Sequence, residues 1–327
     1  MVAHIVPRLP RPIQPLLRPL LRWVLAPLLT VLVASFVIFA ALAQAPGDPV
    51  YRLLGNHATP AQAAYLRHTL GLDQPMLVRY GHWLVGALHG NFGDSITYRA
   101  PVSTLLGSRI ETTLFLVLYA GALCLIVGVV LGVMSATIRP LSPVIAATSG
   151  IGVAIPGFVA AILLISIFSL ALGWFPTGGA GSGFSDRLWH MTLPAAALAT
   201  SWAAYLTQVT RSALVEQRGK EHVETARMRG LSTTRIFRHH VARNAAPPVL
   251  TVSALTVAGL IIGAVTVEAA FGIDGVGSFL VTSIQAKDYN VVEALSVLIV
   301  VVFIAATTLI DIAEVLLDPR LRGKASQ

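Results

Sequence analysis

Charged residues are scarce in this sequence, and cysteine is almost absent. Only 12% of the 327 residues are charged and 55% are hydrophobic, whereas a soluble domain carries about 25% charged residues. The one cysteine, Cys124, lies in an apolar stretch and is interpreted as a small buried apolar residue. A single cysteine excludes an intrachain disulfide and a cysteine-based metal cluster. The composition predicts a protein that lies in a lipid bilayer.

Three chemical patterns are also missing. No Gly-x-x-x-x-Gly-Lys-Ser/Thr loop for nucleotide phosphates occurs, because Gly219-Lys220 lacks the upstream glycine and the hydroxyl. No pair of Asp, Glu or Lys lies in the middle of an apolar stretch, which argues against an ion-coupled secondary transporter. His190, His239 and His240 lack nearby carboxylate or metal partners, which argues against a membrane enzyme. We therefore expect no catalytic site, no bound cofactor and no metal in this chain.

Long stretches without formal charge predict the membrane spans. A helix needs roughly 20 apolar residues to cross the hydrocarbon core, and its backbone polar groups must be paired internally there. Glycine and proline follow residue 172, so the end of the longest stretch is interpreted as a loop. The expected spans are residues 24–44, 112–137, 143–172, 191–212, 246–267 and 292–316. The predicted fold class is an all-α integral membrane protein with six transmembrane helices.

The distribution of lysine and arginine predicts the orientation. With the N-terminus in the cytoplasm, 16 of the 23 cations lie on the cytoplasmic side and 7 on the other, as the positive-inside rule requires. Both termini are therefore expected inside. The predicted organisation is a Pro/Arg-rich tail (1–22), a transmembrane domain (23–317) and a second tail (318–327). Within the domain we expect an external loop at 45–108 and a cytoplasmic loop at 212–245.

Two features of the N-terminal half have alternative interpretations. The first apolar run ends in Ala-Leu-Ala at 41–43, which resembles a signal-peptidase site, but the run is longer than the 7–15 residues of a signal core. The external loop carries several histidines, which could indicate nickel, but it lacks acids or cysteines at ligand spacing. These histidines are His57, His68, His82 and His89. The same loop carries residues suited to the membrane interface: Tyr80, Trp83, Leu84 and Leu88.

Small and polar residues within the spans predict helix packing and a substrate pathway. Gly128 with Gly132, and Gly259 with Gly263, form small-xxx-small pairs that let two helices approach closely. Sparse polar side chains either face the pathway or bond back to their own helix. The pathway candidates are Ser149, Ser166, Thr200, Ser201 and Gln208.

The cytoplasmic loop predicts two short helices that meet at a glycine. A helix over 220–229 would end at Gly230, which is free to adopt a left-handed conformation. Ser232 can cap a second helix that runs through Ile236 to Val241. A rigid knob of this kind, standing off the membrane, suits docking into a groove on a cytoplasmic partner.

The same loop resembles a known signature. Glu224-Thr225-Ala226, followed three residues later by Gly230, is similar to the Glu-Ala-Ala…Gly signature of importer-type ABC permeases, with Thr225 in the middle position. The continuation to Ser232 looks like the dipeptide/oligopeptide/nickel permease family, and the long loop after the first span resembles its first, "B"-type subunit. Asp274 departs from the family, which usually has proline there. The signature continues with Arg243-Asn244-Ala245 and Pro248. Further matching motifs follow in chain order: Pro46-Gly47-Asp48-Pro49, Leu70-Gly71-Leu72-Asp73-Gln74-Pro75, Gly90-Asn91-Phe92-Gly93-Asp94-Ser95, Leu193-Pro194-Ala195, Phe271-Gly272-Ile273-Asp274-Gly275-Val276-Gly277 and Leu317-Asp318-Pro319-Arg320.

The resemblance implies a type I ABC importer permease in a prokaryotic cytoplasmic (inner) membrane. Its implied partners are a second permease subunit, two cytoplasmic ATPase subunits that use ATP and Mg, an extracytoplasmic substrate-binding protein and membrane lipid, with no nucleic acid. The implied substrate is a di- or oligopeptide, and nickel and glutathione are the alternative substrates within the same family. The alternative from another class is an ion-coupled secondary transporter. The residues expected to couple to the ATPases are Glu221, Glu224, Thr225, Ala226, Arg227, Gly230, Leu231 and Ser232.

Overall fold

The computed structural model describes residues 24–44, 50, 54, 59–69 and 71–317 of the chain. Within these residues the fold is helical, without a β-strand, and one isolated bridge joins Asp94 to Pro101. The predicted all-α fold class is therefore confirmed. The two predicted tails, at 1–22 and 318–327, lie outside the described residues, as does the motif at 46–49.

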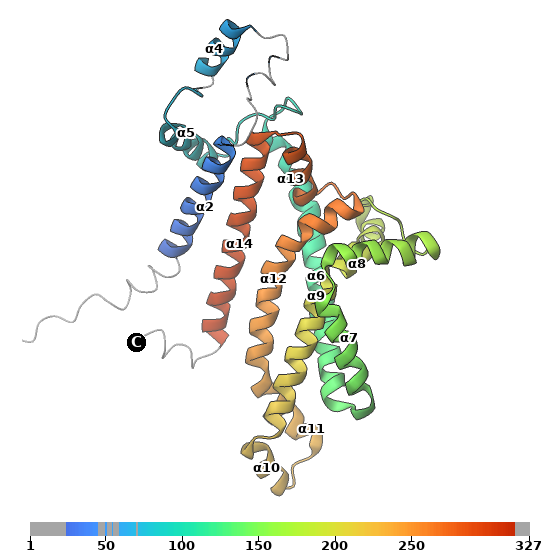
Figure 1. Ribbon diagram of the computed structural model, residues 1–327. Helices are drawn as coiled ribbons and strands as arrows, with labels where there is room; N and C mark the ends of the chain where they lie inside the picture. Colours follow the sequence, from blue (N-terminus) through green and yellow to red (C-terminus); the bar gives the residue numbers. More distant parts are fainter. Residues whose placement is uncertain (1–23, 45–49, 51–53, 55–58, 70, 318–327) are drawn as a thin grey trace, which may run out of the picture.

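Long apolar helices form most of the molecule (Figure 1). Those that can cross a membrane by length and composition are α2 (Ala26–Ala43), α6 (Val102–Thr137), α12 (Arg243–Phe271) and α14 (Tyr289–Leu317). The shortest, α2, has 18 residues and is about 27 Å long. α6, α12 and α14 begin before the expected spans, α6 by ten residues, so helices continue beyond the apolar stretches into both loops.

The expected span at 143–172 is a sharply bent pair of helices. After the short η2 (Arg139–Leu141), α7 (Ser142–Ala154) meets α8 (Gly157–Leu164) and η3 (Ile165–Ala171) at an angle of 108°. Pro156 has no N–H, and Ile155 before it is extended with φ −84° and ψ 115°, as is usual before proline. The Ser201 hydroxyl donates to the Ile155 carbonyl at 2.5 Å, which satisfies one polar group at the break.

The central helix of the bundle is α9 (Gly183–Arg218), which packs against α6, α7, α8 and α12. It is not among the helices that are apolar enough to cross a membrane by composition alone. Its many contacts with other helices shield it from lipid, so its surface need not be strongly apolar. Among the described residues, four helices are long and apolar enough to cross a membrane, or five if the bent pair counts as one span. The count of six spans therefore stays a prediction.

Glycines on α6 and α12 bring their backbones against α9. A Cβ on Gly132 would lie 2.5 Å from the Cβ of Thr210, and one on Gly259 would lie 1.8 Å from the Trp202 ring. No side chain larger than hydrogen fits at either point. The prediction that both small-xxx-small pairs serve close packing is confirmed. The second glycine of each pair approaches α9 in the same way, Gly128 at Leu206 and Gly263 at Leu198.

Short helices lie at opposite ends of the bundle (Figure 1). One end holds α10 (Glu221–Met228), α11 (Thr233–Ile236) and η4 (Phe237–Ala242). The other end holds α4 (Pro60–Thr69), α5 (Met76–Leu88) and α13 (Val276–Gln285). This arrangement fits the expectation that the two hydrophilic loops lie on opposite sides of the membrane.

The glycine contacts predict a position-specific effect on stability. Gly259→Val should destabilise the protein by at least about 1–3 kcal/mol, the usual range for overpacking, because the Trp202 ring must move. The matched control is Gly150→Val on α7, where a Cβ meets nothing within 4 Å. Thermal unfolding in detergent, followed by size-exclusion chromatography, measures both. Equal midpoints for the two variants would contradict the packing assigned to Gly259.

A second prediction concerns sidedness. The loop before α9 and the helix α11 should lie on opposite faces of the membrane, so Ser182→Cys and Thr234→Cys, the latter within α11, should react with an impermeant thiol reagent from opposite sides. Both positions are exposed, and the natural Cys124 is buried. Gly181 is less suitable than Ser182 because its φ is +69°. Labelling of both cysteines in intact cells would refute this topology.

Candidate functional site

The turn between α10 and α11 has the hydrogen bonds of a left-handed helix cap. Gly230 has φ +71°, its N–H donates to Arg227 O at 2.9 Å, and the N–H of Leu231 donates to Ala226 O at 3.3 Å. These are the two bonds of the Schellman motif. The predicted end of the first helix at Gly230 is confirmed, and the reason is the backbone conformation, since a Cβ there would meet no atom within 4 Å.

The inner face of this helix pair is apolar and packs onto the ends of α9 and α12. Val223 is fully buried and Ala226 nearly so, and Leu231 packs against them. We call the buried set the cytoplasmic cluster, after the side on which the sequence predicts this loop: Ala213, Leu214, Val223, Ala226, Ile236, Val241 and Ala245. The cluster fixes the orientation of α10 because the helix has no other apolar face to bury.

The outer face of α10 is exposed and mixed in character. Glu221, Glu224, Thr225 and Arg227 face solvent, and Met228 at the tip is 82% exposed. We call these five residues the coupling surface. Ala226 and Leu231, which were also expected to couple to the ATPases, lie on the inner face and hold the segment in position. The coupling role of the whole set stays a prediction.

Polar contacts further restrain the segment. The Arg218 guanidinium donates to the carbonyl of Ala136 on α6 and lies 5.8 Å from the centre of the Phe237 ring. The ring of His222 on α10 bonds to the carbonyl of His240 at 3.1 Å. Ser232 precedes α11 with extended φ −64° and ψ 147°, but its side chain makes no cap bond. The predicted capping hydroxyl is therefore wrong, and only its backbone carbonyl bonds into the helix, at Ile236 N.

The hydroxyl groups of the serine and threonine pathway candidates donate hydrogen bonds to backbone carbonyls. Ser201 bonds to Ile155 at the break between α7 and α8, and Ser149, Ser166 and Thr200 bond to carbonyls three or four residues earlier in the chain. Gln208 is half-buried on α9. Their role in a substrate pathway stays a prediction. The bonds to earlier carbonyls are Ser149 to Ala146 at 3.1 Å, Ser166 to Ile162 at 2.8 Å and Thr200 to Ala196 at 2.7 Å.

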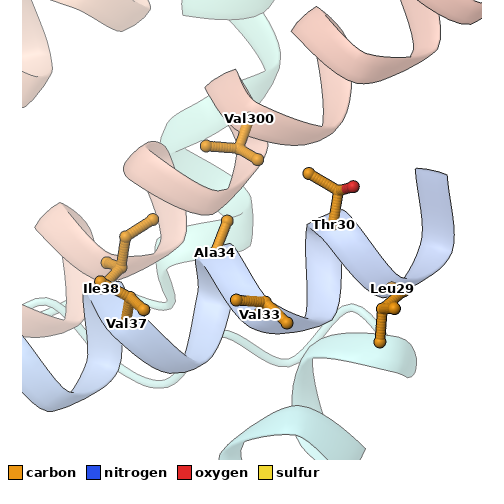
Figure 2. A pocket seen from close by; sticks show the side chains of 7 residues that line it. All are labelled: Leu29, Thr30, Val33, Ala34, Val37, Ile38 and Val300. Carbon is orange, nitrogen blue, oxygen red and sulfur yellow. The ribbon is translucent and has the colours of Figure 1, made fainter. Parts of the chain in front are cut away.

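A groove between α2 and α14 is lined almost entirely by apolar side chains (Figure 2). Its one polar side chain, Thr30, bonds to its own helix at Ala26 O, 2.8 Å away. The groove therefore presents no group that would recognise a peptide or an ion. Its lining residues are Leu29, Thr30, Val33, Ala34, Val37, Ile38 and Val300.

A fully buried carboxylate organises the opposite end of the bundle. Glu268, near the end of α12, accepts hydrogen bonds from the N–H groups of Gly277 and Ser278 at 2.8 and 3.1 Å. Thr113 on α6 donates to Glu268 at 2.5 Å and accepts from Val276 N at 2.8 Å. Together they satisfy the first N–H groups of α13, which would otherwise be unpaired. We call Glu268 and Thr113 the outer clasp.

The glycine motif around the clasp has a steric reason. A Cβ on Gly275 would lie 2.4 Å from the Glu268 carboxyl carbon, and Gly272 ends α12 with φ +59°. Asp274, the position that departs from the family pattern, accepts a 2.8 Å bond from Arg109, whose guanidinium lies 4.1 Å from the Phe279 ring centre. Sequence reasoning missed Glu268 because it placed the end of the span at 267. A charge directly before a glycine-rich motif was the available signal.

A second buried carboxylate holds the loop before α6. Asp288 accepts bonds from the Ser95 hydroxyl at 2.6 Å and from the Thr97 N–H at 3.0 Å. The Asn290 amide donates to Asp94 O at 2.9 Å. The external Gly90–Ser95 motif is thereby fixed to the junction of α13 and α14.

The external histidines gather no metal site in the part of the chain that the structure describes, since no group of three or more metal-binding side chains occurs there. His57 lies outside the described residues. His68 contacts Asp73 at 2.9 Å, and this hydrogen bond holds the pKa of the exposed Asp73 carboxyl below its ordinary value.

Removal of the buried Glu268 carboxylate from the outer clasp should lower the stability of the protein. Glu268→Ala should destabilise the protein by about 2–3 kcal/mol, because it leaves buried N–H groups unpaired. Glu268→Gln should cost less, because an amide can still accept from Gly277 and donate to Thr113. Glu111→Ala is the control, since the Glu111 side chain is 69% exposed and an ion pair at the surface is worth about 0–1 kcal/mol. Thermal unfolding of the three variants tests this, and equal losses for Glu268→Ala and Glu111→Ala would contradict it.

Comparisons with known proteins agree with this architecture. Residues 96–323 match the family described as binding-protein-dependent transport system inner membrane component, and residues 16–116 match the N-terminal part of such membrane components. The chain is 37% identical to the oligopeptide transport system permease protein AppB of Bacillus subtilis, over 90% of this chain and 95% of that protein. It is 33% identical to the glutathione transport system permease protein GsiC of Salmonella choleraesuis, again over 90% and 95%.

Solved structures share the fold. An inward-facing form of the MetNI methionine ABC transporter superposes with a TM-score of 0.51 at 20% identity, over 68% of this chain and 97% of that one. An amino acid ABC transporter structure gives 0.52 at 18% identity, over 65% and 94%. The family match covers more than half of the chain and the similarity to AppB extends over nearly all of it. The chain belongs to the binding-protein-dependent transport system inner membrane component family, the permeases of ABC importers.

Proposed function

We propose that this chain is one of two permease subunits of an ATP-driven importer of di- or oligopeptides. A second permease completes the pathway, and two cytoplasmic ATPases bind the coupling surface and hydrolyse ATP with Mg. An extracytoplasmic binding protein delivers the substrate. The protein lies in the cytoplasmic membrane with both termini and the α10–α11 segment inside, as the distribution of lysine and arginine requires.

The relatives support the peptide substrate. Proteins more than 30% identical over about nine tenths of this chain include permeases named for oligopeptide, peptide and glutathione transport. Glutathione is itself a small peptide, so these names share one substrate chemistry. The chain has few polar groups within its spans with which to select a substrate, which favours selection by the external binding protein.

The observation that carries the proposal is the geometry of α10. One face is buried in the cytoplasmic cluster and the other is exposed, with Met228 at its tip. A short helix with a fixed base and an exposed apolar tip fits a groove on a soluble partner. Because α9 runs directly into this segment and α12 directly out of it, movement of the partner is passed to two helices at once.

The alternative from another class is an ion-coupled transporter, which needs ionisable groups along its pathway. Three carboxylates are buried in the described part of the chain: Glu268, Asp288 and Glu293. Glu268 and Asp288 each accept backbone N–H bonds that hold the loops of one end. Their bonding favours a structural role over ion transport. Uptake that depends on ATP and persists without an ion gradient would distinguish the two mechanisms.

The coupling segment predicts two variants with the same outcome for different reasons. Gly230→Val strains the backbone, because φ +71° is costly for a β-branched residue. Met228→Asp leaves the Gly230 cap intact and places a negative charge at the tip of α10, which is the part proposed to contact the ATPase. Both should insert normally, yet lose ATPase subunits on affinity purification and lose ATP-dependent uptake of labelled peptide. Glu224→Ala should show a weaker loss.

The matched control is Gly219→Val, in the same loop. Gly219 has φ −88°, and a Cβ there would meet only Glu216 O, at 3.7 Å. It should retain ATPase binding and uptake. Normal ATPase retention and uptake in both Gly230→Val and Met228→Asp would refute the coupling role. Normal ATPase binding with lost uptake would place the defect in the membrane domain instead.

A further inference from the structure

The external helix α5 carries an apolar face that no other described part of the chain covers. Leu77, Val85 and Leu88 are 68%, 57% and 78% exposed. At 100° per residue they lie on one side of the helix together with Gly81, whose Cβ position meets nothing within 4 Å. A helix in water would carry polar side chains on such a face, so this one requires an apolar environment.

The opposite face of α5 is packed against the membrane-spanning α2. The Tyr80 hydroxyl lies 2.8 Å from the Ser35 hydroxyl and donates to Leu32 O at 3.2 Å. Its ring stands edge-on to Phe36 and Phe39, with centroids 5.2 and 5.6 Å apart. Tyr80 and Trp83, which we expected in the membrane interface, therefore face α2. The expectation for Leu88 stays a prediction.

The contacts on α2 set the depth of α5. Leu32 and Ser35 precede Ala43, the last residue of α2, by 11 and 8 residues, or about 16 and 12 Å along the helix axis. The hydrocarbon core is about 30 Å thick. Figure 1 shows α5 next to the upper end of α2, and the Tyr80 contacts reach from there to Leu32 and Ser35 in the outer part of that helix. Residues of α2 at the same depth, such as Val37, are also exposed and apolar.

The remaining edge of α5 is polar. His82 is exposed, and Arg79 stacks over the Phe39 ring at 5.7 Å. Both lie across the helix from Leu77 and Leu88. A helix with one polar edge and one wide apolar face is suited to the boundary between headgroups and hydrocarbon.

We propose that α5 is an interfacial helix that inserts Leu77, Val85 and Leu88 into the lipid leaflet on the side of α4 and α13. Its partner is the hydrocarbon of membrane lipids. The helix would then anchor the external segment at a fixed height above the bilayer. The proposal requires only that α2 spans the membrane, so it does not depend on the proposed transport function.

Spin labels test the environment of this face. Single cysteines at Leu77, Val85 and Leu88 are introduced with Cys124→Ser and labelled in the full chain, in vesicles of phosphatidylethanolamine and phosphatidylglycerol. Val37→Cys on α2 is the lipid-exposed reference. Tyr65→Cys on α4 is the water reference, because Tyr65 is 75% exposed. The three α5 labels should be relaxed more by oxygen, which partitions into lipid, than by a water-soluble nickel chelate, as at Val37.

Each outcome decides the proposal. Labels that behave like Tyr65 would overturn it, because the face would then lie in water. Labels shielded from both reagents would also overturn it, because a protein would cover the face. If the cysteine variants fail to insert, the unmodified chain is irradiated with a phospholipid that carries a diazirine on its acyl chain. Adducts within residues 77–88 support the proposal, and adducts in α2 with none in α5 refute it.

Discussion

The close approach of α9 to the glycines of α6 and α12 is the contact on which the rest of the structure depends. Lipid chains are as apolar as leucine, so helices in a bilayer gain little from hydrophobic association and are held by close packing. Gly132 and Gly259 remove the side chains that would separate the helices. Because α9 is held on two sides, both of its ends become fixed platforms for the loops.

The two ends of the bundle are stabilised by different interactions. On the side of α10 the loop residues pack through apolar side chains in the cytoplasmic cluster. On the opposite side, Glu268 and Asp288 hold their loops through buried hydrogen bonds. α12 joins the two, since its 29 residues run from the end of η4 to the outer clasp, a distance of about 43 Å. α12 therefore connects the segment around α10 to the base of α13 through one continuous helix.

Much of the fold was predictable because a helix that crosses the hydrocarbon core needs about 20 apolar residues, so stretches without charge indicate the spans. Each expected span coincides with a helix or, at 143–172, with a bent pair. The angle of 108° at Pro156 was not predictable, because it depends on α9 offering Ser201 to the free carbonyl of Ile155. The sequence of α9 is less apolar than the other spans because neighbouring helices shield α9 from lipid. Glu268 and Asp288 were missed because their partners, Thr113 and Ser95, lie more than 150 residues away.

The coupling segment shows how far local chemistry alone can be followed. The cap at Gly230 involves bonds among residues 226–231 only, so a short stretch of sequence determines it. Which side of α10 is buried depends on Ala213, Leu214 and Ala245 from two other helices, so the sequence of the segment alone does not show that Ala226 is buried. Within this triplet Glu224 and Thr225 face solvent, and Ala226 packs into the cytoplasmic cluster and anchors them. A small residue at 226 is needed for the helix to approach the bundle, whatever partner its outer face binds.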